Sequence, residues 1–522
     1  MPSPGENLSA RILGGALERG WGDRVALREG DRAWTYAELS DQSRRVATAL
    51  RTLRIGRGER VAVFMRDSLE AAASILGALY MGAVVVPLSE LARPKNLRDY
   101  LNHSGAVAAI VHESLEPTLD QIRAEVPNLR EVLCTGVRSP GERDFYSAVR
   151  AAAPAPEAAA VSTDDPALLL YSAGGGPNNP RGVPHVHGTP VAAHESFARG
   201  VVGMTDSDVV FSVVRLSTSY GLGTGLLFPL LSGAEAALLP EQPHSEALFA
   251  VIESLRPTVL FATPSVYGQL ARDAAAVGRS APLAGIRCVS GAEGMPPKLV
   301  PRIRSVLGAE VIVGYGLTEA FQFVLTGSAD ASRPGACGVP VAGFAARIVD
   351  DEGVEMGSDE IGALELRGPT LLTRYWGDAE PIELADGWFR TRDRFMRDAE
   401  GGYYHCGRTD DLFKVGGKWV SPIEVERALV AHEAVWECAV VGADDEDGLI
   451  KPLAFVVPNV GQTAGAELEE TLREYVKTEL APYKYPRWFE FVDALPRGPN
   501  GKLLRYKLRL SPRVRRAETA AD

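Results

Sequence analysis

Four loops in this 522-residue sequence carry residue types that could bind a phosphate-rich ligand. The first, residues 172–183, reads SAGGGPNNPRGV, a run of glycines that ends on an arginine. Backbone N–H groups approach phosphate oxygens closely where side chains are absent, and a cation neutralises the charge. A flexible surface turn explains this loop alone equally well, and the Walker A pattern G-x-x-x-x-G-K-[ST] does not occur.

The second loop, residues 314–319, reads GYGLTE and follows the apolar segment 310–313. Loops at the carboxyl ends of parallel strands are where α/β folds bind ligands. The Glu319 carboxylate beside the Thr318 hydroxyl could hold Mg²⁺ on a triphosphate. Alone this pair is a weak signal, because most glutamates are simply solvated.

The other two loops offer a carboxylate and a lysine. GWFRTRD at residues 387–393 presents Asp393, which could accept hydrogen bonds from ribose hydroxyls, and is followed by GRTDDLFKVGG at residues 407–417. LPRGPNGKLLR at residues 495–505 is a turn-rich loop that presents Lys502. Each is compatible with an ordinary polar turn, but the four together, in this order, indicate a nucleotide site.

Short apolar segments alternate with segments of helical periodicity. This alternation predicts an α/β fold, with a large N-terminal domain of layered, mainly parallel sheets. The stretch 68–88 is apolar enough to be considered as a membrane span, but Glu70, Gly82 and Pro87 favour a buried helix followed by a strand. The predicted strands are residues 61–65, 106–111, 167–171, 209–214, 258–262, 286–289 and 310–313, and the predicted helices include 36–53, 245–255 and 296–307.

The character of the sequence changes near residue 400. Beyond it we expect a helix at 422–430, strands at 438–441 and 453–457, a helix at 466–480 and a strand at 488–492. This is the size of a small, mobile α+β domain. We therefore expect an N-terminal domain of residues 1–409 and a C-terminal domain of residues 411–522, with a hinge at Asp410.

Composition excludes several classes of function. The net charge of −12 argues against a nucleic-acid partner. The five cysteines form no C-x-x-C pair, which argues against a zinc site or a disulfide framework, and His185 and His187 lack a third metal ligand. The first ten residues lack the pattern of a signal peptide. We expect a cytoplasmic protein without a membrane partner.

Taken together, the four loops resemble those of the acyl-adenylate-forming superfamily of acyl-CoA synthetases, peptide-synthetase adenylation domains and luciferases. The resemblance spans roughly residues 20–510. Within the superfamily the chain is most similar to the benzoate-CoA ligase branch. The pointers are HVH at 185–187, YGLG at 220–223, RYWG at 374–377 and LAPYKYPR at 480–487.

The resemblance implies ATP, Mg²⁺ and coenzyme A as cofactors, and it assigns roles to individual residues. Lys502, Thr318 and Glu319 would be catalytic, and Glu319 would also bind the metal. Asp410 would be the hinge, and Gly416 and Gly417 would line the coenzyme A tunnel. ATP or AMP would contact Ser172, Gly174, Arg181, Gly291, Ala292, Glu293, Tyr315, Gly316, Asp393 and Arg408, and the acid would contact Ser219, Tyr220, Gly291, Gly316, Gln322 and Phe323.

The glycine loop departs from the family pattern Y-[ST]-S-G-[ST]-T-G-x-P-K-G. Ala173, Gly175 and Gly176 replace hydroxyl residues, and Arg181 replaces the lysine. Arginine keeps the charge but changes its geometry. We expect weaker use of ATP, with activity retained.

The resulting hypothesis is ATP-dependent activation of a small aromatic acid to an acyl-AMP, followed by transfer to coenzyme A. Gln322 and the polar segment 217–220 favour a hydroxyl or amino substituent on the ring. One alternative is a standalone enzyme that loads a carrier protein's phosphopantetheine. Another is a non-catalytic relative, against which Lys502, Glu319 and Asp393 argue. Nothing in the sequence favours a luciferase-type oxygenase.

Overall fold

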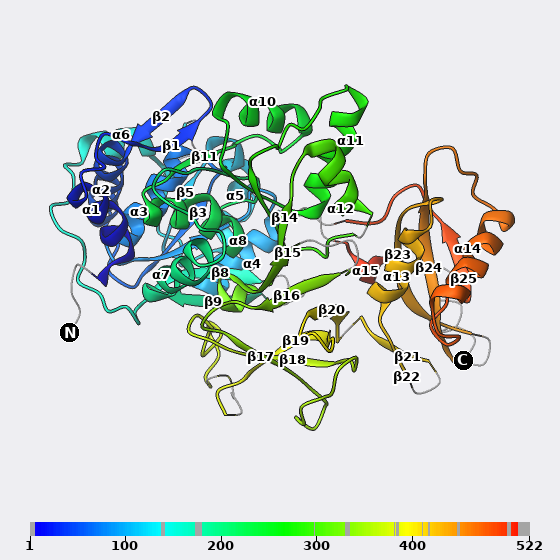
Figure 1. The fold of residues 1–522 in the computed structure, drawn as a ribbon. Coiled ribbons are helices and arrows are strands. Elements are labelled where there is room, and N and C mark those ends of the chain that lie inside the picture. The colour runs from blue at the N-terminus through cyan, green and yellow to red at the C-terminus, as the bar shows by residue number, and fades with distance from the viewer. Residues whose placement is uncertain are drawn as a thin grey trace.

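The described residues form two large sheets and two small ones (Figure 1). It is a computed structural model that describes residues 6–136, 141–172, 180–296, 298–328, 333, 335–380, 382, 386–409, 411–415, 418–445, 449–497 and 503–509. The predicted class, layered sheets with helices plus a smaller C-terminal α+β unit, is confirmed.

The first large sheet has seven strands, and all neighbours are parallel except β8 and β9, which form the hairpin that carries the glycine loop. Its middle strands are buried apart from Arg60 at one strand end, as continuous apolar runs predict. In spatial order the strands are β7 (Arg143–Asp144), β6 (Glu131–Cys134), β5 (Ala108–Val111), β3 (Arg60–Phe64), β4 (Val84–Pro87), β8 (Pro166–Ser172) and β9 (Arg181–Val186).

The second large sheet has thirteen strands. Its parallel block is β1 (Val25–Glu29), β11 (Glu235–Leu238), β10 (Val209–Ser212), β12 (Val259–Ala262), β13 (Arg287–Ser290) and β14 (Val311–Gly316). Antiparallel strands extend it: β2 (Arg32–Thr35) at one edge, and β15 (Phe323–Ser328), β16 (Ala336–Pro340), β20 (Tyr403–Arg408), β19 (Phe389–Arg397), β18 (Gly362–Arg367) and β17 (Ala345–Val349) at the other. The sequence did not predict the extension from β15 to β17, because its strands carry too many charges and glycines to read as apolar runs.

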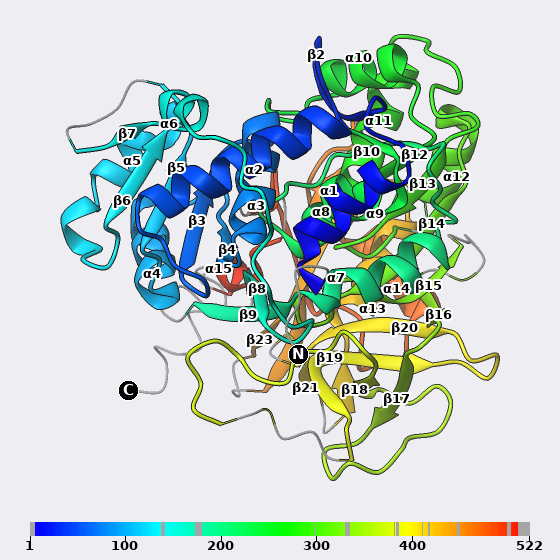
Figure 2. The same cartoon turned by 90° about the vertical axis from the view of Figure 1, so that its left-hand side faces the viewer.

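Helices α1 (Leu8–Glu18), α2 (Tyr36–Thr52) and α3 (Leu69–Tyr80) share one hydrophobic core with strands of both large sheets (Figure 2). Every residue of α3 is buried. A Cβ on Gly77 would lie 2.6 Å from the Ser43 carbonyl oxygen, so only glycine allows α2 and α3 to pack this closely. Residues 68–88 thus form a buried helix and strand, and among the described residues no helix could span a membrane.

The remaining helices of this part of the chain cover the sheets. The helix predicted at 245–255 is α10, whereas the one predicted at 296–307 begins at Leu299 and widens into a π-helix at Ile303. The elements are α4 (Pro94–Ser104), α5 (Glu116–Asp120), α6 (Phe145–Ala151), α7 (Gly188–Ala193), α8 (Ser219–Leu222), α9 (Phe228–Ser232), α10 (Ser245–Leu255), α11 (Pro264–Ala276) and α12 (Leu299–Arg302), with π-helices η5 (His194–Arg199), η6 (Gly223–Leu227) and η7 (Ile303–Leu307) and the short 3₁₀ helices η2 (Glu113–Leu115) and η3 (Arg123–Glu125).

The C-terminal elements pack around a core of their own, at the right of Figure 1. Strands β23 and β24 are antiparallel, and β25 joins β24 in parallel. The bounds are β21 (Phe413–Val415), β22 (Lys418–Val420), α13 (Pro422–Ala431), β23 (Val435–Asp444), β24 (Ile450–Pro458), α14 (Ala466–Glu479), β25 (Trp488–Phe491) and α15 (Arg505–Leu508).

Arg215, which follows β10, connects the strand ends of the two large sheets. Its guanidinium lies 3.6 Å from the Asp67 carboxylate, after β3, and 3.2 Å from that of Glu90, after β4. Burial raises the pKa of Asp67 to about 7, although the charge of Arg215 opposes this shift. The buried ion cluster therefore holds the carboxyl ends of β3, β4 and β10 together.

His187 attaches helix α1 to the rest of the fold. Its Nδ1 accepts a hydrogen bond of 3.2 Å from the Leu8 backbone N–H, and Asn7 caps the same helix. The ring is buried, and burial lowers the pKa of His187 to about 4. Protonation of Nδ1 would remove the acceptor that holds α1.

We therefore expect acid to destabilise the fold through this ring. Between about pH 6.5 and about pH 4 the unfolded chain binds a proton that the folded chain excludes, so stability falls as the pH falls. His187→Gln keeps an acceptor but does not titrate. Between pH 7 and pH 5 its free energy of unfolding should therefore fall by about 2 kcal/mol less than that of wild type. Urea unfolding followed by circular dichroism at both pH values measures this difference.

The control is His244→Asn, which retains a helix-capping side chain at an exposed position. It should show the wild-type loss of stability. An equal loss in His187→Gln would show that titration of this ring does not control the attachment of α1.

Candidate active site

The candidate site lies where β13 and β14 end. Ser290 is paired with Val313 in this parallel pair, so the loop 291–293 and the end of β14 at Tyr315 and Gly316 lie at the same edge of the sheet. Ala292 and Phe321 both have positive φ, 69° and 63°. Non-glycine residues in this region are strained and cluster at functional sites. The structure thus brings together loops separated by about twenty residues.

Asp393 on β19 is held by two aromatic donors. The Tyr315 hydroxyl donates to Oδ2 at 2.7 Å, and His405 Nε2 lies 3.3 Å from Oδ1. The rings of Tyr315 and His405 are stacked, and both pack on Phe395. Arg408 is the cross-strand partner of Asp393.

Electrostatics keep the Asp393 carboxylate ionised. Burial raises its pKa, but hydrogen bonds and charge from His405, the Tyr315 hydroxyl and the charge of Arg408 outweigh burial, and the net pKa is lowered. Burial raises the pKa of Tyr315 well above its usual value, so this phenol remains a neutral donor. A carboxylate has about four acceptor positions, which leaves capacity for the hydroxyls of a ligand.

A second group of residues in contact consists of Arg181, Tyr375 and Glu319. Arg181 Cζ lies 4.3 Å from the centre of the Tyr375 ring, and the Tyr375 hydroxyl donates to Glu319 Oε1 at 3.1 Å. The 3₁₀ helix η8 (Thr318–Ala320) places Glu319, and its carbonyl accepts from Leu372 N at 2.9 Å. Trp376 N donates to the Gly182 carbonyl at 2.9 Å, so the segment 372–376 fixes the arginine and the carboxylate relative to each other.

The donor set of Glu319 suits a hard cation. Oε1 accepts from Tyr375, which leaves Oε2 available, and one or two carboxylates plus phosphate oxygens are the usual protein set for Mg²⁺. Among the described residues no group of three or more His, Cys, Asp or Glu side chains could hold a metal alone. His187 is occupied by helix α1, and His185 is buried against the ring of Phe321.

Two other predicted nucleotide contacts, Ser172 and Glu293, have different surroundings. Ser172 ends β8 opposite Arg181, and its Oγ is buried without a hydrogen-bond partner among the described residues. Glu293 accepts a 2.6 Å hydrogen bond from Ser265 Oγ, which turns its side chain toward α11. Gly174, Asp410, Gly416, Gly417 and Lys502 lie outside the described residues, as do the altered positions Ala173, Gly175 and Gly176.

The predicted acid-pocket residues converge on one aromatic ring. Phe323 lies so close to three glycines that a Cβ would fall 2.1 Å from it at Gly291, 2.2 Å at Gly314 and 2.8 Å at Gly316. Tyr220 packs on Phe323 at 5.0 Å between ring centres, and Phe197 packs on it at 4.9 Å. Ser219 begins α8, one residue before Tyr220. This cluster makes an apolar, aromatic environment beside the Tyr315 strand end.

Two buried polar atoms lie among these apolar groups. Gln322 Oε1 accepts from Ser196 Oγ at 3.0 Å, but Gln322 Nε2 has no partner among the described residues, and neither does Ser290 Oγ. A buried donor without a partner costs about 1–3 kcal/mol, so a ligand that pairs with it gains affinity. Ser196 lies in the π-helix η5, and η6 follows α8 after Tyr220. Such irregular turns are frequent at functional sites.

Sequence reasoning missed Tyr375 as a site residue, and it missed His405, Ser196 and Ser290 entirely. Tyr375 falls inside a quoted motif but had no role assigned to it. His405 precedes Arg408 by three residues, yet only the β19–β20 pairing brings it to Asp393. Ser196 lies 126 residues from Gln322 and carries no local signal.

Comparison with known proteins identifies the family. The model described as AMP-binding enzyme matches residues 17–376, and the model of its C-terminal domain matches residues 424–502. Benzoate–CoA ligase from Thauera aromatica is 36% identical, with 96% of this chain and 95% of that protein covered. 4-Hydroxybenzoate–CoA/benzoate–CoA ligase from Rhodopseudomonas palustris is 34% identical, with 98% and 95% covered.

A solved structure agrees with these relatives. The crystal structure of an anthranilate CoA ligase in complex with anthranoyl-AMP superposes with a TM-score of 0.88, at 33% identity and with 96% of each chain covered. Two family models and relatives covered over almost their whole length therefore match this chain. The chain belongs to the AMP-binding enzyme family.

Proposed function

We propose that this enzyme activates a small aromatic carboxylic acid with ATP and transfers the acyl group from the acyl-AMP to coenzyme A. The observation that carries the proposal is the arrangement around β14. On one side of Gly314–Gly316 lies the Asp393 cluster, and on the other lies the aromatic cluster of Phe323 and Tyr220. Full-length similarity to benzoate and hydroxybenzoate CoA ligases supports the same reaction.

The test is a panel of carboxylic acids with ATP, Mg²⁺ and coenzyme A, with pyrophosphate release and thioester formation measured separately. Benzoates with a hydroxyl or amino substituent should be the best substrates. Better turnover of long-chain fatty acids would exclude an aromatic acid. Acyl transfer only to carrier proteins would support the carrier-loading alternative, and absence of pyrophosphate release would support a non-catalytic protein.

The site residues take these roles in the proposal. Asp393 accepts the ribose hydroxyls, while Arg181 and Ser172 contact phosphate. Glu319 would hold Mg²⁺, which would neutralise phosphate charge. Lys502 would act between the acid carboxylate and the α-phosphate, cancelling their repulsion and stabilising charge on the five-coordinate phosphorus.

We also propose that residues 1–409 and 411–522 are separate domains that alternate about Asp410. One site cannot hold the lysine, the departing pyrophosphate and the incoming pantetheine at once. A hinged domain presents Lys502 for the first step and Gly416–Gly417 for the second. Thiolate attack on the acyl carbon then displaces AMP.

Asp393→Asn should raise the KM for ATP by about 10- to 100-fold, because a hydrogen bond to a charged group contributes about 1.5–3 kcal/mol. Steady-state kinetics at saturating acid and coenzyme A measure this effect. Asp398→Asn is a matched control, since Asp398 accepts a 2.7 Å hydrogen bond from Tyr404 as Asp393 does from Tyr315. Equal effects in the two variants would show that Asp393 supports the sheet and does not bind ribose.

Gln322→Met should change the choice of substrate. Methionine keeps the length of the side chain but removes the unpaired Nε2 donor. We expect kcat/KM for a hydroxybenzoate to fall at least about 10-fold relative to benzoate, because a lost polar contact penalises only the substituted ring. Gln121→Met, at an exposed position, is the control. An unchanged ratio in Gln322→Met would show that this amide does not contact the substituent.

Lys502→Ala should raise the activation free energy of adenylate formation by several kcal/mol, the scale of losing a charge contact in a transition state. Thioester formation from synthetic acyl-adenylate and coenzyme A should remain nearly intact. Asp410→Pro should do the opposite by restricting the pivot. Single-turnover assays of both half-reactions measure this split, with Lys507→Ala as the control. Equal losses in both steps for Lys502→Ala would contradict the alternation.

A further inference from the structure

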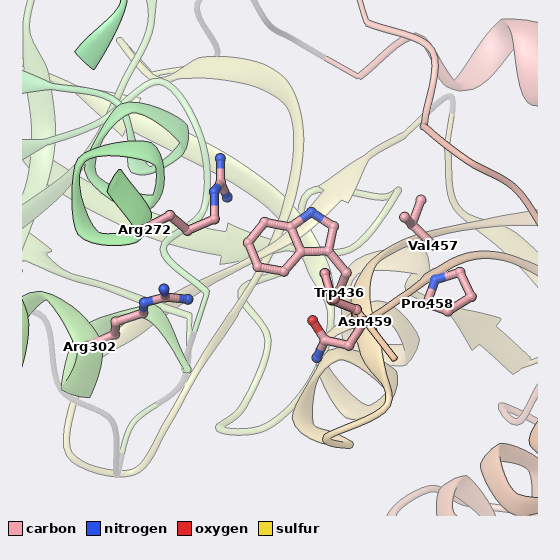
Figure 3. A pocket seen from close by; sticks show the side chains of 7 residues that line it. Arg272, Arg302, Trp436, Val457, Pro458 and Asn459 are labelled. Carbon is pink, nitrogen blue, oxygen red and sulfur yellow. The ribbon is translucent and has the colours of Figure 1, made fainter. Parts of the chain in front are cut away.

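A pocket of about 500 Å³ lies between the two parts of the molecule, away from the strand-end site (Figure 3). Helices α11 and α12 supply one wall, and the start of β23 and the end of β24 supply the other. The volume is in the range of small-molecule sites. The lining residues are Arg272, Arg302, Trp436, Val457, Pro458, Asn459 and Val460.

The arginine wall carries two positive charges. Neither the Arg272 nor the Arg302 guanidinium forms an ion pair or a hydrogen bond within the described part of the chain. Arg272 Cζ instead lies 4.5 Å from the centre of the Trp436 ring. No carboxylate of a described residue lines the pocket, and the neighbouring Glu437 is held by Arg497 at 2.6 Å.

Electrostatics agree with this geometry. Burial lowers the pKa of Arg272, and the charge of Arg302 adds to this effect, while Asp273 and Glu437 partly oppose it. Two neighbouring guanidiniums repel each other, and an anion between them would relieve this repulsion. The pocket therefore has an unfilled anion-binding capacity.

The opposite wall has another chemistry. Val457, Pro458 and Val460 are apolar, and Trp436 remains 39% exposed beside them. Asn459 is tied back to the Glu433 carbonyl through its side chain. A bare inorganic anion would leave this wall unused, whereas a flat ring would cover it and contact the indole.

We propose that this pocket binds a second nucleoside monophosphate, with its phosphate between Arg272 and Arg302 and its base against Trp436 and the valine–proline wall. The binding does not depend on the proposed function. Because both walls are needed, the bound nucleotide stabilises the arrangement of the two parts seen here. If the C-terminal part rotates as proposed above, the ligand shifts the equilibrium toward the arrangement seen here.

The test is calorimetric titration of the full-length enzyme with AMP. Wild type should bind two equivalents. Arg302→Gln and Arg272→Gln should each weaken the binding of one AMP equivalent at least 10-fold and leave the binding of the other equivalent unchanged. The control is Arg304→Gln, which lies two residues from Arg302 but is paired with Glu310 and should bind AMP as wild type does. Asp393→Asn should weaken the other equivalent, so failure of the strand-end assignment is seen separately.

Two results would overturn the proposal. One is a wild type in which no AMP equivalent is weakened by Arg272→Gln or by Arg302→Gln. The other is displacement of AMP from the pocket by inorganic phosphate at the same concentration, which would show that the base contributes nothing. Thermal unfolding of each variant checks that it is folded, and Arg302→Gln keeps the test valid if Arg272→Gln loses its packing against Trp436.

Discussion

The ring of Phe323 packs directly on the backbone of Gly291, Gly314 and Gly316, and the shape of the site depends on this contact. Any side chain at these glycines would overlap the ring by more than packing tolerates. The ring in turn supports Tyr220 and Phe197. Strand β14 can therefore separate two environments, one aromatic and one polar, by the thickness of a backbone.

The polar side of β14 depends on the antiparallel extension of the large sheet. Asp393 and His405 lie on β19 and β20, strands that reach Tyr315 only because β15 and β16 continue the sheet beyond the parallel block. The parallel block supplies the loops at its carboxyl ends, and the extension supplies the carboxylate. A nucleotide site formed this way needs both kinds of strand pairing.

Buried polar groups occur at several points of the same architecture, and each has a different consequence. His187 Nδ1 has a partner and anchors α1, whereas His187 Nε2, Gln322 Nε2 and Ser290 Oγ are without partners among the described residues. The first case stabilises the fold, since a buried acceptor is satisfied. The second costs stability and creates affinity for a ligand that supplies the missing partner.

The sequence by itself determined the α/β class, the positions of the apolar strands and most loops of the site. Apolar runs indicate buried strands, and motifs of glycine, arginine and carboxylate residues indicate ligand chemistry. Both kinds of signal can be read from the sequence because the residues that form each one lie within a few positions of each other. It predicted Gly291, Gly316, Gln322 and Phe323 as one pocket, but only through family resemblance.

The tertiary structure alone decided which distant side chains meet. Tyr375 reaches Glu319, His405 reaches Asp393, and Arg272 faces Trp436 across 164 residues of chain. None of these pairs has a local signal, because strand order, register and the packing of the C-terminal part set their distances. Contacts between residues far apart in sequence depend on the tertiary fold of the whole chain, and that fold is set by the packing of the core.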